Sequence, residues 1–239
     1  TKDVEFNFVQ IDQSTAYYSS AKRKNNYQAK IYKSQYENNQ WQKGKYINFG
    51  EKYSVTNLSF LRSSEIKYIT LCDALSNCKI AIKTDSLKIL NNDINLKNTN
   101  NTQPNIANHN NQKVLYFVSD REGGFGGMDI WLSMIDNKGN YGVPINAGKN
   151  INTQADEVTP FYNSNDSSLY FSSNKKGGLG GLDLYKSKGK LNLWMESKNI
   201  TELNSEYDEM YLTFFTKEKG YFTSNRKDTS CCNDIYSFE

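Results

Sequence analysis

The chain has 239 residues, with 29 Lys and Arg against 26 Asp and Glu, so its formal net charge is only +3. This weak charge gives no support to nucleic-acid binding, and no apolar run reaches the roughly 18 residues that a membrane span needs. Hydrophobic residues make up only 37% of the chain but aromatic residues 13%, which is typical of β-sheets and argues against global disorder.

A short motif recurs along the chain, with degenerate copies at residues 19–32 and 69–81 and closer copies at 118–131, 172–185 and 223–236. Its reference positions are Ser20, Thr70, Ser119, Ser173 and Ser224. Spacings of 49 to 54 residues match a four-stranded propeller blade, and no helical periodicity is present. The sequence therefore predicts an all-β, five-bladed propeller of four-stranded antiparallel blades. We expect one domain over residues 1–239, with blades near 1–48, 49–96, 97–150, 151–202 and 203–239.

The strand pattern is clearest in the last two units. In the fourth unit, strands are predicted at 156–162, 168–173, 183–187 and 191–195, with turn-rich residues between them. The fifth unit repeats this plan at 208–214, 220–224 and 234–238 and has no fourth strand. Because residues 4–8 look like the first strand of blade 1, we expect a strand outside these residues, or at the other terminus, to complete the last blade.

Residues 91–112 are rich in Asn and almost free of apolar side chains. This composition predicts a long, mobile surface loop. His109, the single histidine, is expected to be solvated in that loop and not catalytic. No catalytic motif of a known kind is found elsewhere in the chain.

Two glycine-rich segments lie where the second and third strands of a blade should be joined by a hairpin. They consist of Gly123, Gly124, Gly126, Gly127, Gly177, Gly178, Gly180 and Gly181. We interpret them as tight turns that use positive φ angles. A phosphate-binding loop is the alternative, but it should open a helix and carry a Lys-Ser/Thr pair, and neither is present.

Charged residues recur beside these hairpins. The third strands begin with Asp129, Asp183 and Asp234, and the second strands are followed by Arg121, Lys175 and Arg226. The favoured interpretation is structural: each Asp accepts backbone N–H bonds and balances the opposing cation, with a metal or ligand role as the alternative. The acidic pairs at the first strands are Asp156, Glu157, Asp208 and Glu209. We expect them to hydrogen-bond between blades; binding of a cation or a basic partner is the alternative.

Four cysteines occur where the repeat is irregular. Cys72 and Cys78 bracket the hairpin of blade 2, so a disulfide across it is geometrically plausible. Cys231 and Cys232 replace a Gly-Gly pair in the last unit, where a vicinal disulfide, separate partners or free thiols are the alternatives. The spacing does not suit zinc, and no metal or other cofactor is predicted. An even cysteine count with a hairpin pair favours an oxidising, extracytoplasmic compartment.

The copies at 118–131, 172–185 and 223–236 resemble the TolB-type, WD-like (PD-repeat) propeller motif. They are most similar to the version in OmpA-family, peptidoglycan-associated outer-membrane lipoproteins of Bacteroidota, some of which belong to the type IX secretion and gliding machinery. The resemblance implies a periplasmic, outer-membrane-associated protein with envelope protein partners. Peptidoglycan would be bound only through a neighbouring domain, and neither nucleic acid nor a membrane span is expected.

The first functional hypothesis is a non-catalytic binding or scaffolding module of an envelope complex, so the chain is predicted not to be an enzyme. The alternative is a glycan or peptidoglycan-fragment binder that uses exposed aromatic residues at the channel mouth, with Tyr27, Phe125 and Tyr207 as candidates. A second alternative is a hydrolase or lyase with an acidic, calcium-assisted site in the channel.

Overall fold

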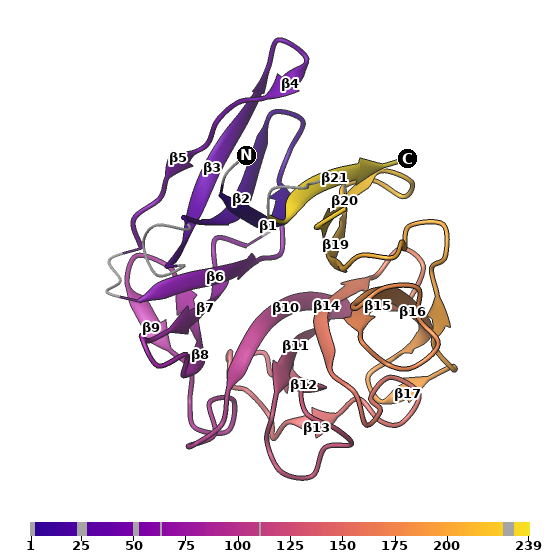
Figure 1. The fold of residues 1–239 in the computed structure, drawn as a ribbon. Coiled ribbons are helices and arrows are strands. Elements are labelled where there is room, and N and C mark those ends of the chain that lie inside the picture. Colours follow the sequence, from indigo (N-terminus) through magenta and orange to yellow (C-terminus); the bar gives the residue numbers. More distant parts are fainter. Residues whose placement is uncertain (1–2, 23–27, 50–52, 63, 110, 227–231) are drawn as a thin grey trace.

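The computed structural model describes residues 3–22, 28–49, 53–62, 64–109, 111–226 and 232–239. Within these residues the chain forms strands and no helix, and the strands assemble into five antiparallel sheets around a common axis (Figure 1). The predicted all-β, five-bladed propeller is therefore confirmed. The sheets follow one another in chain order and are called blades 1 to 5. No helix among the described residues is long and apolar enough to cross a membrane.

The strands of each blade are numbered from the axis outward. Blade 1 contains β1 (Val4–Gln10), β2 (Thr15–Ala21), β3 (Ala29–Glu37), β4 (Gln40–Trp41) and β5 (Lys45–Tyr46). Blade 2 contains β6 (Ser54–Ser59), β7 (Lys67–Cys72), β8 (Cys78–Lys83) and β9 (Leu87–Ile89). Blade 3 contains β10 (Asn101–His109), β11 (Gln112–Ser119), β12 (Asp129–Ile135) and β13 (Ile145–Asn146). Blade 4 contains β14 (Glu157–Asn163), β15 (Ser168–Ser173), β16 (Asp183–Lys190), β17 (Leu193–Trp194) and β18 (Lys198–Asn199). Blade 5 contains β19 (Glu209–Phe214), β20 (Gly220–Ser224) and β21 (Asp234–Phe238).

The outer strands differ from the prediction. In blade 4 the third strand continues through the expected turn at 187–190, and β17 pairs only with its end. The fourth-strand position beside Tyr185 is taken by β18, further along the chain than the expected 191–195. Blade 5 has three strands among the described residues, because β1 pairs with β2 in blade 1 and does not join β21.

The second strand of each blade lies between two neighbouring blades, so both of its faces are covered. Val114 to Ser119 in β11 and all six residues of β15 are buried. Strands covered on both faces lose the apolar–polar alternation of half-exposed sheets. The largest hydrophobic cluster joins blades 3 and 4 and includes Val118, Ile130 and Phe171. The core is therefore a series of layers between blades.

Each innermost strand contains a β-bulge. The register shifts in the middle of all five strands, and the bulge holds a non-glycine residue at positive φ in four of them: Asn7, Gln103, Thr159 and Tyr211, at 51° to 53°. A bulge increases strand twist and changes the direction of a side chain. Here the bulges lie around the axis and shape the lining of the central channel.

The predicted mobile loop at 91–112 is wrong in its second half. Residues 101–109 form β10, the innermost strand of blade 3, in which Asn101 and Asn105 are buried. His109 is not simply solvated: its ring stacks on Tyr162 at 3.9 Å between centroids. An inner strand can be this polar because its amides bond to neighbouring strands instead of water. Asn105 Oδ1, for example, accepts the N–H of Tyr162 at 3.0 Å.

Candidate functional site

An aspartate holds each of the two glycine hairpins. In blade 3, the carboxylate of Asp129 accepts hydrogen bonds from the N–H groups of Phe125 at 2.5 Å and Gly126 at 3.2 Å. Asp183 holds the hairpin of blade 4 in the same way, at 2.9 and 3.3 Å. Such charge-assisted bonds fix a loop that would otherwise be flexible. Asp234 begins β21 at the same position, but most of its hairpin lies outside the described residues.

The glycines allow the hairpins to lie against the next blade. Of the eight glycines in the two hairpins, only Gly123 and Gly177 have positive φ, +88° and +93°. A Cβ on Gly126 or Gly180 would collide with backbone carbonyl oxygens of the connection into the following blade. Close approach is therefore a second reason for glycine, beyond the turn geometry that the sequence suggested. Each hairpin is packed against its neighbour and forms part of a rigid face.

The acidic pairs join blades at the same place. Oδ1 of Asp156 in blade 4 accepts the N–H of Met128 in blade 3 at 2.8 Å. Asp208 in blade 5 accepts the N–H of Leu182 in blade 4 at 2.9 Å. The first member of each pair therefore bonds the hairpin of the preceding blade to the strand that follows.

The second members of the pairs, Glu157 and Glu209, are fully buried. Glu157 accepts bonds from the N–H of Thr153 at 2.7 Å and from Ser173 Oγ at 2.8 Å, and burial raises the pKa of its carboxyl group. Glu209 has an additional cation, because Arg226 lies 2.7 Å from its Oε1. Neither carboxylate is exposed at the channel mouth, so the structure gives no support to their meeting a cation or basic partner there.

The recurrent basic residues cover aromatic pairs. The guanidinium of Arg121 lies over Phe117 at 4.9 Å and Trp131 at 5.3 Å, and burial lowers the pKa of Arg121 to about 10. Lys175 and Arg226 lie over the equivalent rings of blades 4 and 5. These cation–π contacts are worth roughly 0.5–2 kcal/mol each and stabilise the outer end of each hairpin.

Sequence reasoning missed a repeated asparagine. Asn152 Oδ1 accepts the N–H of Ile130 in the preceding blade, and its Nδ2 donates to the carbonyl of the same residue, both at 2.9 Å. Asn95 and Asn204 make the same pair of bonds to blades 2 and 4. The available signal was an aliphatic residue before each asparagine, at Ile94, Ile151 and Leu203.

The clamped hairpins present apolar side chains to solvent. Leu75, Phe125 and Leu179 lie at the hairpin tips of blades 2, 3 and 4 and are 84%, 49% and 54% exposed. Tyr207, in the connection packed against Gly180, is 43% exposed. Tyr27, another predicted contact residue, lies outside the described residues. We call this side of the ring the hairpin face.

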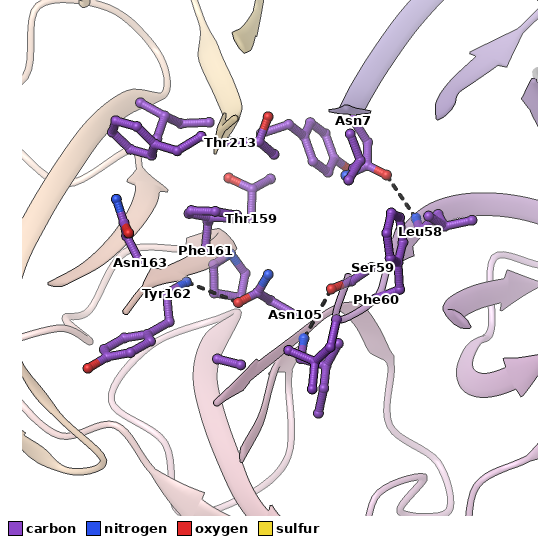
Figure 2. A pocket seen from close by; sticks show the side chains of 18 of the residues that line it. Asn7, Leu58, Ser59, Phe60, Asn105, Thr159, Phe161, Tyr162, Asn163 and Thr213 are labelled. Atoms are coloured by element: carbon purple, nitrogen blue, oxygen red, sulfur yellow. Dashed lines mark hydrogen bonds between the residues drawn. The ribbon is translucent and has the colours of Figure 1, made fainter. Parts of the chain in front are cut away.

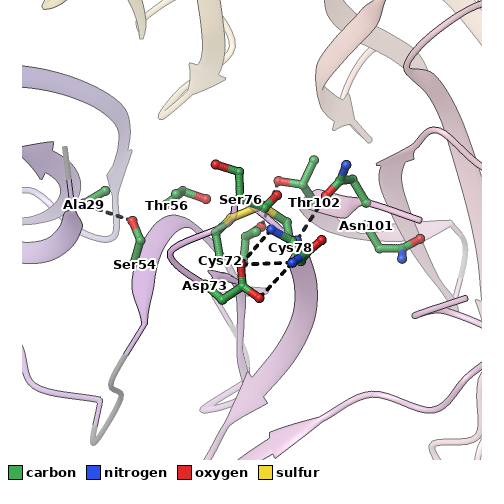
Figure 3. Close-up of a disulfide and its surroundings, with 12 residues drawn as sticks. Ala29, Ser54, Thr56, Cys72, Asp73, Ser76, Cys78, Asn101 and Thr102 are labelled. Carbon is green, nitrogen blue, oxygen red and sulfur yellow. Dashed lines mark hydrogen bonds between the residues drawn. A yellow bond between two sulfur atoms is a disulfide. The ribbon is translucent and has the colours of Figure 1, made fainter. Parts of the chain in front are cut away.

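The hairpin of blade 2 has a different clamp (Figure 3). Cys72 and Cys78, a directly opposed pair on β7 and β8, form a disulfide. Between them, the Asp73 carboxylate accepts two backbone N–H bonds of the hairpin at 2.9 Å. This hairpin is therefore held by an aspartate, like those of blades 3 and 4, and in addition by a disulfide. Cys232 is also disulfide-bonded, while Cys231 lies outside the described residues.

A cavity of about 310 Å³ lies on the axis and is lined by the innermost strands of all five blades (Figure 2). Its lining combines aromatic rings, including Phe60 and Phe161, with amide side chains, including Asn105 and Asn163. Hydrogen bonds from one inner strand to the next surround it, such as Leu58 N–H to Asn7 Oδ1 at 2.8 Å. The cavity reaches the first-to-second-strand hairpins, on the side of the ring opposite the hairpin face.

Tyr211 on β19 is one of the residues that line this cavity. Its hydroxyl oxygen is 3.4 Å from Nε2 of Gln103 and also hydrogen-bonds with Asn57, and burial raises the pKa of the phenol. At the outer end, Arg62 is the single charged residue among the lining residues; it lies over the ring of Phe215 at 4.8 Å. Apart from Arg62, the described residues of the lining are uncharged.

An acidic, calcium-assisted site is not visible in the described part of the chain. There, no group of three or more His, Cys, Asp or Glu residues could hold a metal ion.

No protein-family model and no curated protein matches this chain. Solved structures do match. They include the endo-arabinase from Bacteroides thetaiotaomicron, with 15% identity, a TM-score of 0.67 and coverage of 99% of this chain and 93% of that one. An alpha-L-arabinofuranosidase from Podospora anserina in complex with cellotriose has 7% identity, a TM-score of 0.62 and coverage of 98% and 89%. TolB from Acinetobacter baumannii has 14% identity, a TM-score of 0.54 and coverage of 93% and 51%.

These matches establish a propeller of the kind seen in TolB and in glycoside hydrolases. They contradict the prediction that the chain is not an enzyme, because many of the structural neighbours are hydrolases built on the same five-bladed ring. With identities of 7% to 15%, the likeness to hydrolases concerns the fold and assigns no activity to this chain.

Proposed function

We propose that this chain is a partner-binding module of the bacterial cell envelope and that the hairpin face is its contact surface. One observation carries the proposal: Leu75, Phe125 and Leu179 are exposed at the tips of three hairpins that are held by a disulfide or by buried aspartates. Apolar side chains on the surface are favourable in a complex, and loops that are already rigid lose little entropy on binding.

The proposed compartment is the periplasm. The Cys72–Cys78 disulfide supports an oxidising environment, and the fold likeness to TolB agrees with an envelope role. The motif resemblance to OmpA-family lipoproteins adds the proposal of an outer-membrane-associated complex, with the type IX secretion and gliding machinery as one candidate. Peptidoglycan contact would come from a neighbouring domain.

Site-specific photo-crosslinking in cells tests the contact surface. A photoreactive amino acid is placed at Leu75, Phe125 or Leu179, and matched controls carry it at Val143 or Leu193, which are 79% and 73% exposed on the opposite side of the ring. We expect discrete adducts from the three hairpin positions and none from the controls. Equal adducts from both sides, or none from the hairpins, would contradict the proposal.

A second candidate, glycan binding, is favoured by the axial cavity. Aromatic rings stack on the apolar faces of sugars and amides bond to hydroxyls, and the lining of the cavity supplies both kinds of side chain. Glycan-array screening followed by calorimetry tests this function. We expect Phe161→Ala, in the cavity, to abolish binding and Phe125→Ala, on the hairpin face, to leave it unchanged. Binding that depends on Phe125 instead would remove the cavity from consideration.

A further inference from the structure

Two asparagines that line the axial cavity use only the oxygen end of their side-chain amides. Oδ1 of Asn7 accepts the N–H of Leu58 at 2.8 Å, and Oδ1 of Asn105 accepts the N–H of Tyr162 at 3.0 Å (Figure 2). No described residue accepts a hydrogen bond from either Nδ2 group, although Asn7 and Asn105 are only 9% and 8% exposed. Neither nitrogen is sealed inside the protein, and in Figure 2 that of Asn105 extends toward the open centre of the cavity. The cavity therefore contains amide donors that the described chain does not use.

A third asparagine has the same arrangement. Asn163 ends β14, where its Oδ1 accepts the N–H of Asn165 at 3.0 Å, and it is 6% exposed. Among the described residues, none accepts a bond from its Nδ2 group. Buried polar groups in proteins are almost always hydrogen-bonded, so the three amides need acceptors that water or a ligand supplies. A ligand with many oxygen atoms on its surface fits this requirement.

Arg62 adds a positive charge at the outer end of the cavity. Its Nη2 donates a hydrogen bond to the carbonyl of Phe215 at 2.9 Å, while the guanidinium lies over the ring of the same residue. No ion pair joins Arg62 to a carboxylate of the described chain. A guanidinium has five N–H donors in a planar fork that matches the two oxygens of a carboxylate. Arg62 is thus held in place by Phe215 and keeps donors for a charged group of a ligand.

Aromatic rings complete the lining. Phe60 of blade 2 and Phe161 of blade 4 are partly buried there. Such rings pack on the apolar face of a sugar ring. The volume of about 310 Å³ lies at the lower end of the range of about 300–1,000 Å³ found for small-molecule sites. A cavity of this size suits a short saccharide or the end of a longer one.

We propose that the axial cavity selects sugars that carry a carboxylate group. The guanidinium of Arg62 binds the carboxylate, the three amides donate to oxygen atoms of the sugar, and the two phenylalanines pack on its rings. This inference rests on the glycan-binding function proposed above and adds the class of ligand. The same chemistry occurs in hexuronic acids and in N-acetylmuramic acid, so the experiment includes both.

Matched pairs of sugars test the class of ligand. Trigalacturonate is compared with its methyl ester, which keeps the rings and removes the charges, and N-acetylmuramic acid is compared with N-acetylglucosamine. Binding to the 239-residue protein is measured by calorimetry near neutral pH. We expect the acidic member of at least one pair to bind at least about tenfold more tightly, because hydrogen bonds between charged groups are the stronger ones. The pair that shows the preference identifies the source of the sugar.

Arg62→Gln separates the carboxylate contact from sugar binding. The variant removes the charge of an exposed side chain, so we expect a folded protein that binds the neutral sugar as before and has lost the preference for the acidic one. Lys138→Gln is the matched control, because it removes a positive charge from an exposed turn on the same side of the ring, and it should keep the preference. Phe161→Ala should abolish binding of both members of a pair.

The free end of the Asn105 amide gives a second test. Asn105→Asp preserves the oxygen that accepts the N–H of Tyr162 but puts a second oxygen in place of Nδ2. We expect the folded variant to bind the acidic sugar at least about tenfold more weakly, because one donor is lost and two carboxylates repel each other. Arg62→Gln, at an exposed position, decides the question if this variant does not fold.

The outcomes separate this inference from the function on which it rests. Equal binding of acidic and neutral sugars overturns the inference and leaves glycan binding in place. Failure of every sugar to bind overturns both. A preference that survives Arg62→Gln, or tighter binding of an acidic peptide such as triglutamate, also overturns the inference.

Discussion

We call the interface between two neighbouring blades a seam. The seam between blades 3 and 4 differs in its contacts from the seam between blades 5 and 1. The first contains the largest hydrophobic cluster, and buried polar bonds cross it, including those from Met128 to Asp156 and between Asn152 and Ile130. The second depends on aromatic packing, with Phe8 of blade 1 centred 4.4 Å from Tyr221 of blade 5. Only this second seam borders a blade without a fourth strand in the described structure.

The difference shows how the repeat stabilises the ring. Where the full motif is present, each blade supplies an aspartate and an asparagine that satisfy backbone groups of the preceding blade, and a buried glutamate that bonds within its own blade, so the seams share one set of bonds. Where the ring closes, only part of the set is present, and larger side chains supply the contact. We therefore expect substitutions of buried polar residues to cost more at the repeated seams than single contacts cost at the closing seam.

The largest effect is expected for Asn152→Ala. Asn152 is 1% exposed, and its loss leaves the buried N–H of Ile130 without its partner, while the carbonyl of Ile130 keeps the bond from the N–H of Ala147. An unsatisfied buried group costs about 1–3 kcal/mol, so we expect the free energy of unfolding to fall by up to about 3 kcal/mol in urea titrations. Asn137→Ala, in an exposed turn, is the control. A loss below about 1 kcal/mol would contradict the proposed role of the asparagine.

A matched pair of glutamates compares a direct ion pair with a weaker electrostatic contact, the one between Glu157 and Lys175. Glu157→Gln and Glu209→Gln each remove a carboxylate that accepts similar bonds, but only Glu209 also pairs with Arg226. Breaking a buried ion pair leaves an uncompensated charge. We expect Glu209→Gln to cost about 2 kcal/mol more than Glu157→Gln in the same unfolding assay. Equal losses would show that the aromatic and backbone contacts of Arg226 stabilise its charge without the carboxylate of Glu209.

The raised pKa of Glu157 adds a pH dependence to this pair. A carboxyl group with a higher pKa in the folded than in the unfolded protein binds its proton more tightly in the native state. Its contribution to stability is therefore full below the unfolded pKa and is lost as pH rises through the folded pKa. We expect the deficit of Glu157→Gln to be largest near pH 4 and to shrink toward pH 7.

Much of the fold could be predicted because the strands are short apolar runs between turn residues. The ranges 168–173, 220–224 and 234–238 agree residue for residue with β15, β20 and β21. The inner strand β10 could not be recognised, since Gln103 and Asn105 satisfy backbone N–H groups of blade 4 and the polar composition of the strand resembles that of a loop. Whether a polar segment is solvated or buried against distant strands depends on contacts that are not local in sequence.

The candidate sites were predictable only in part. The spacing of Cys72 and Cys78 about a hairpin was enough to suggest a disulfide, because the two positions are neighbours in the structure whenever the hairpin forms. The axial cavity combines side chains from strands that are far apart in sequence, so no local motif marks it.

At the closing seam, Tyr221→Phe should have a smaller effect than either polar substitution. It removes a hydroxyl group that bonds to Gln10 at 2.9 Å and to Trp41 Nε1 at 3.3 Å, and it leaves the aromatic packing in place. We expect a loss of about 1 kcal/mol in urea titrations, the usual net value of one hydrogen bond. Tyr36→Phe, at an exposed tyrosine of blade 1, is the control. A loss above that of Asn152→Ala would reverse the comparison of the two seams.

The smallest effect at neutral pH is expected for His109→Gln, at the seam between blades 3 and 4. The imidazole of His109 stacks on Tyr162 and lies 2.9 Å from the hydroxyl of Tyr116, and burial, together with Lys190, lowers its pKa to about 4 from 6.5. The native protein thus keeps this ring neutral while the unfolded chain protonates it. The resulting stability is present above pH 6.5 and is lost as pH falls toward 4.

Because the chain has one histidine, its imidazole NMR signals give this pKa directly, and the His109→Gln protein should lose stability less steeply between pH 6.5 and 4. A normal pKa would mean that the ring is open to water and contributes nothing to this seam.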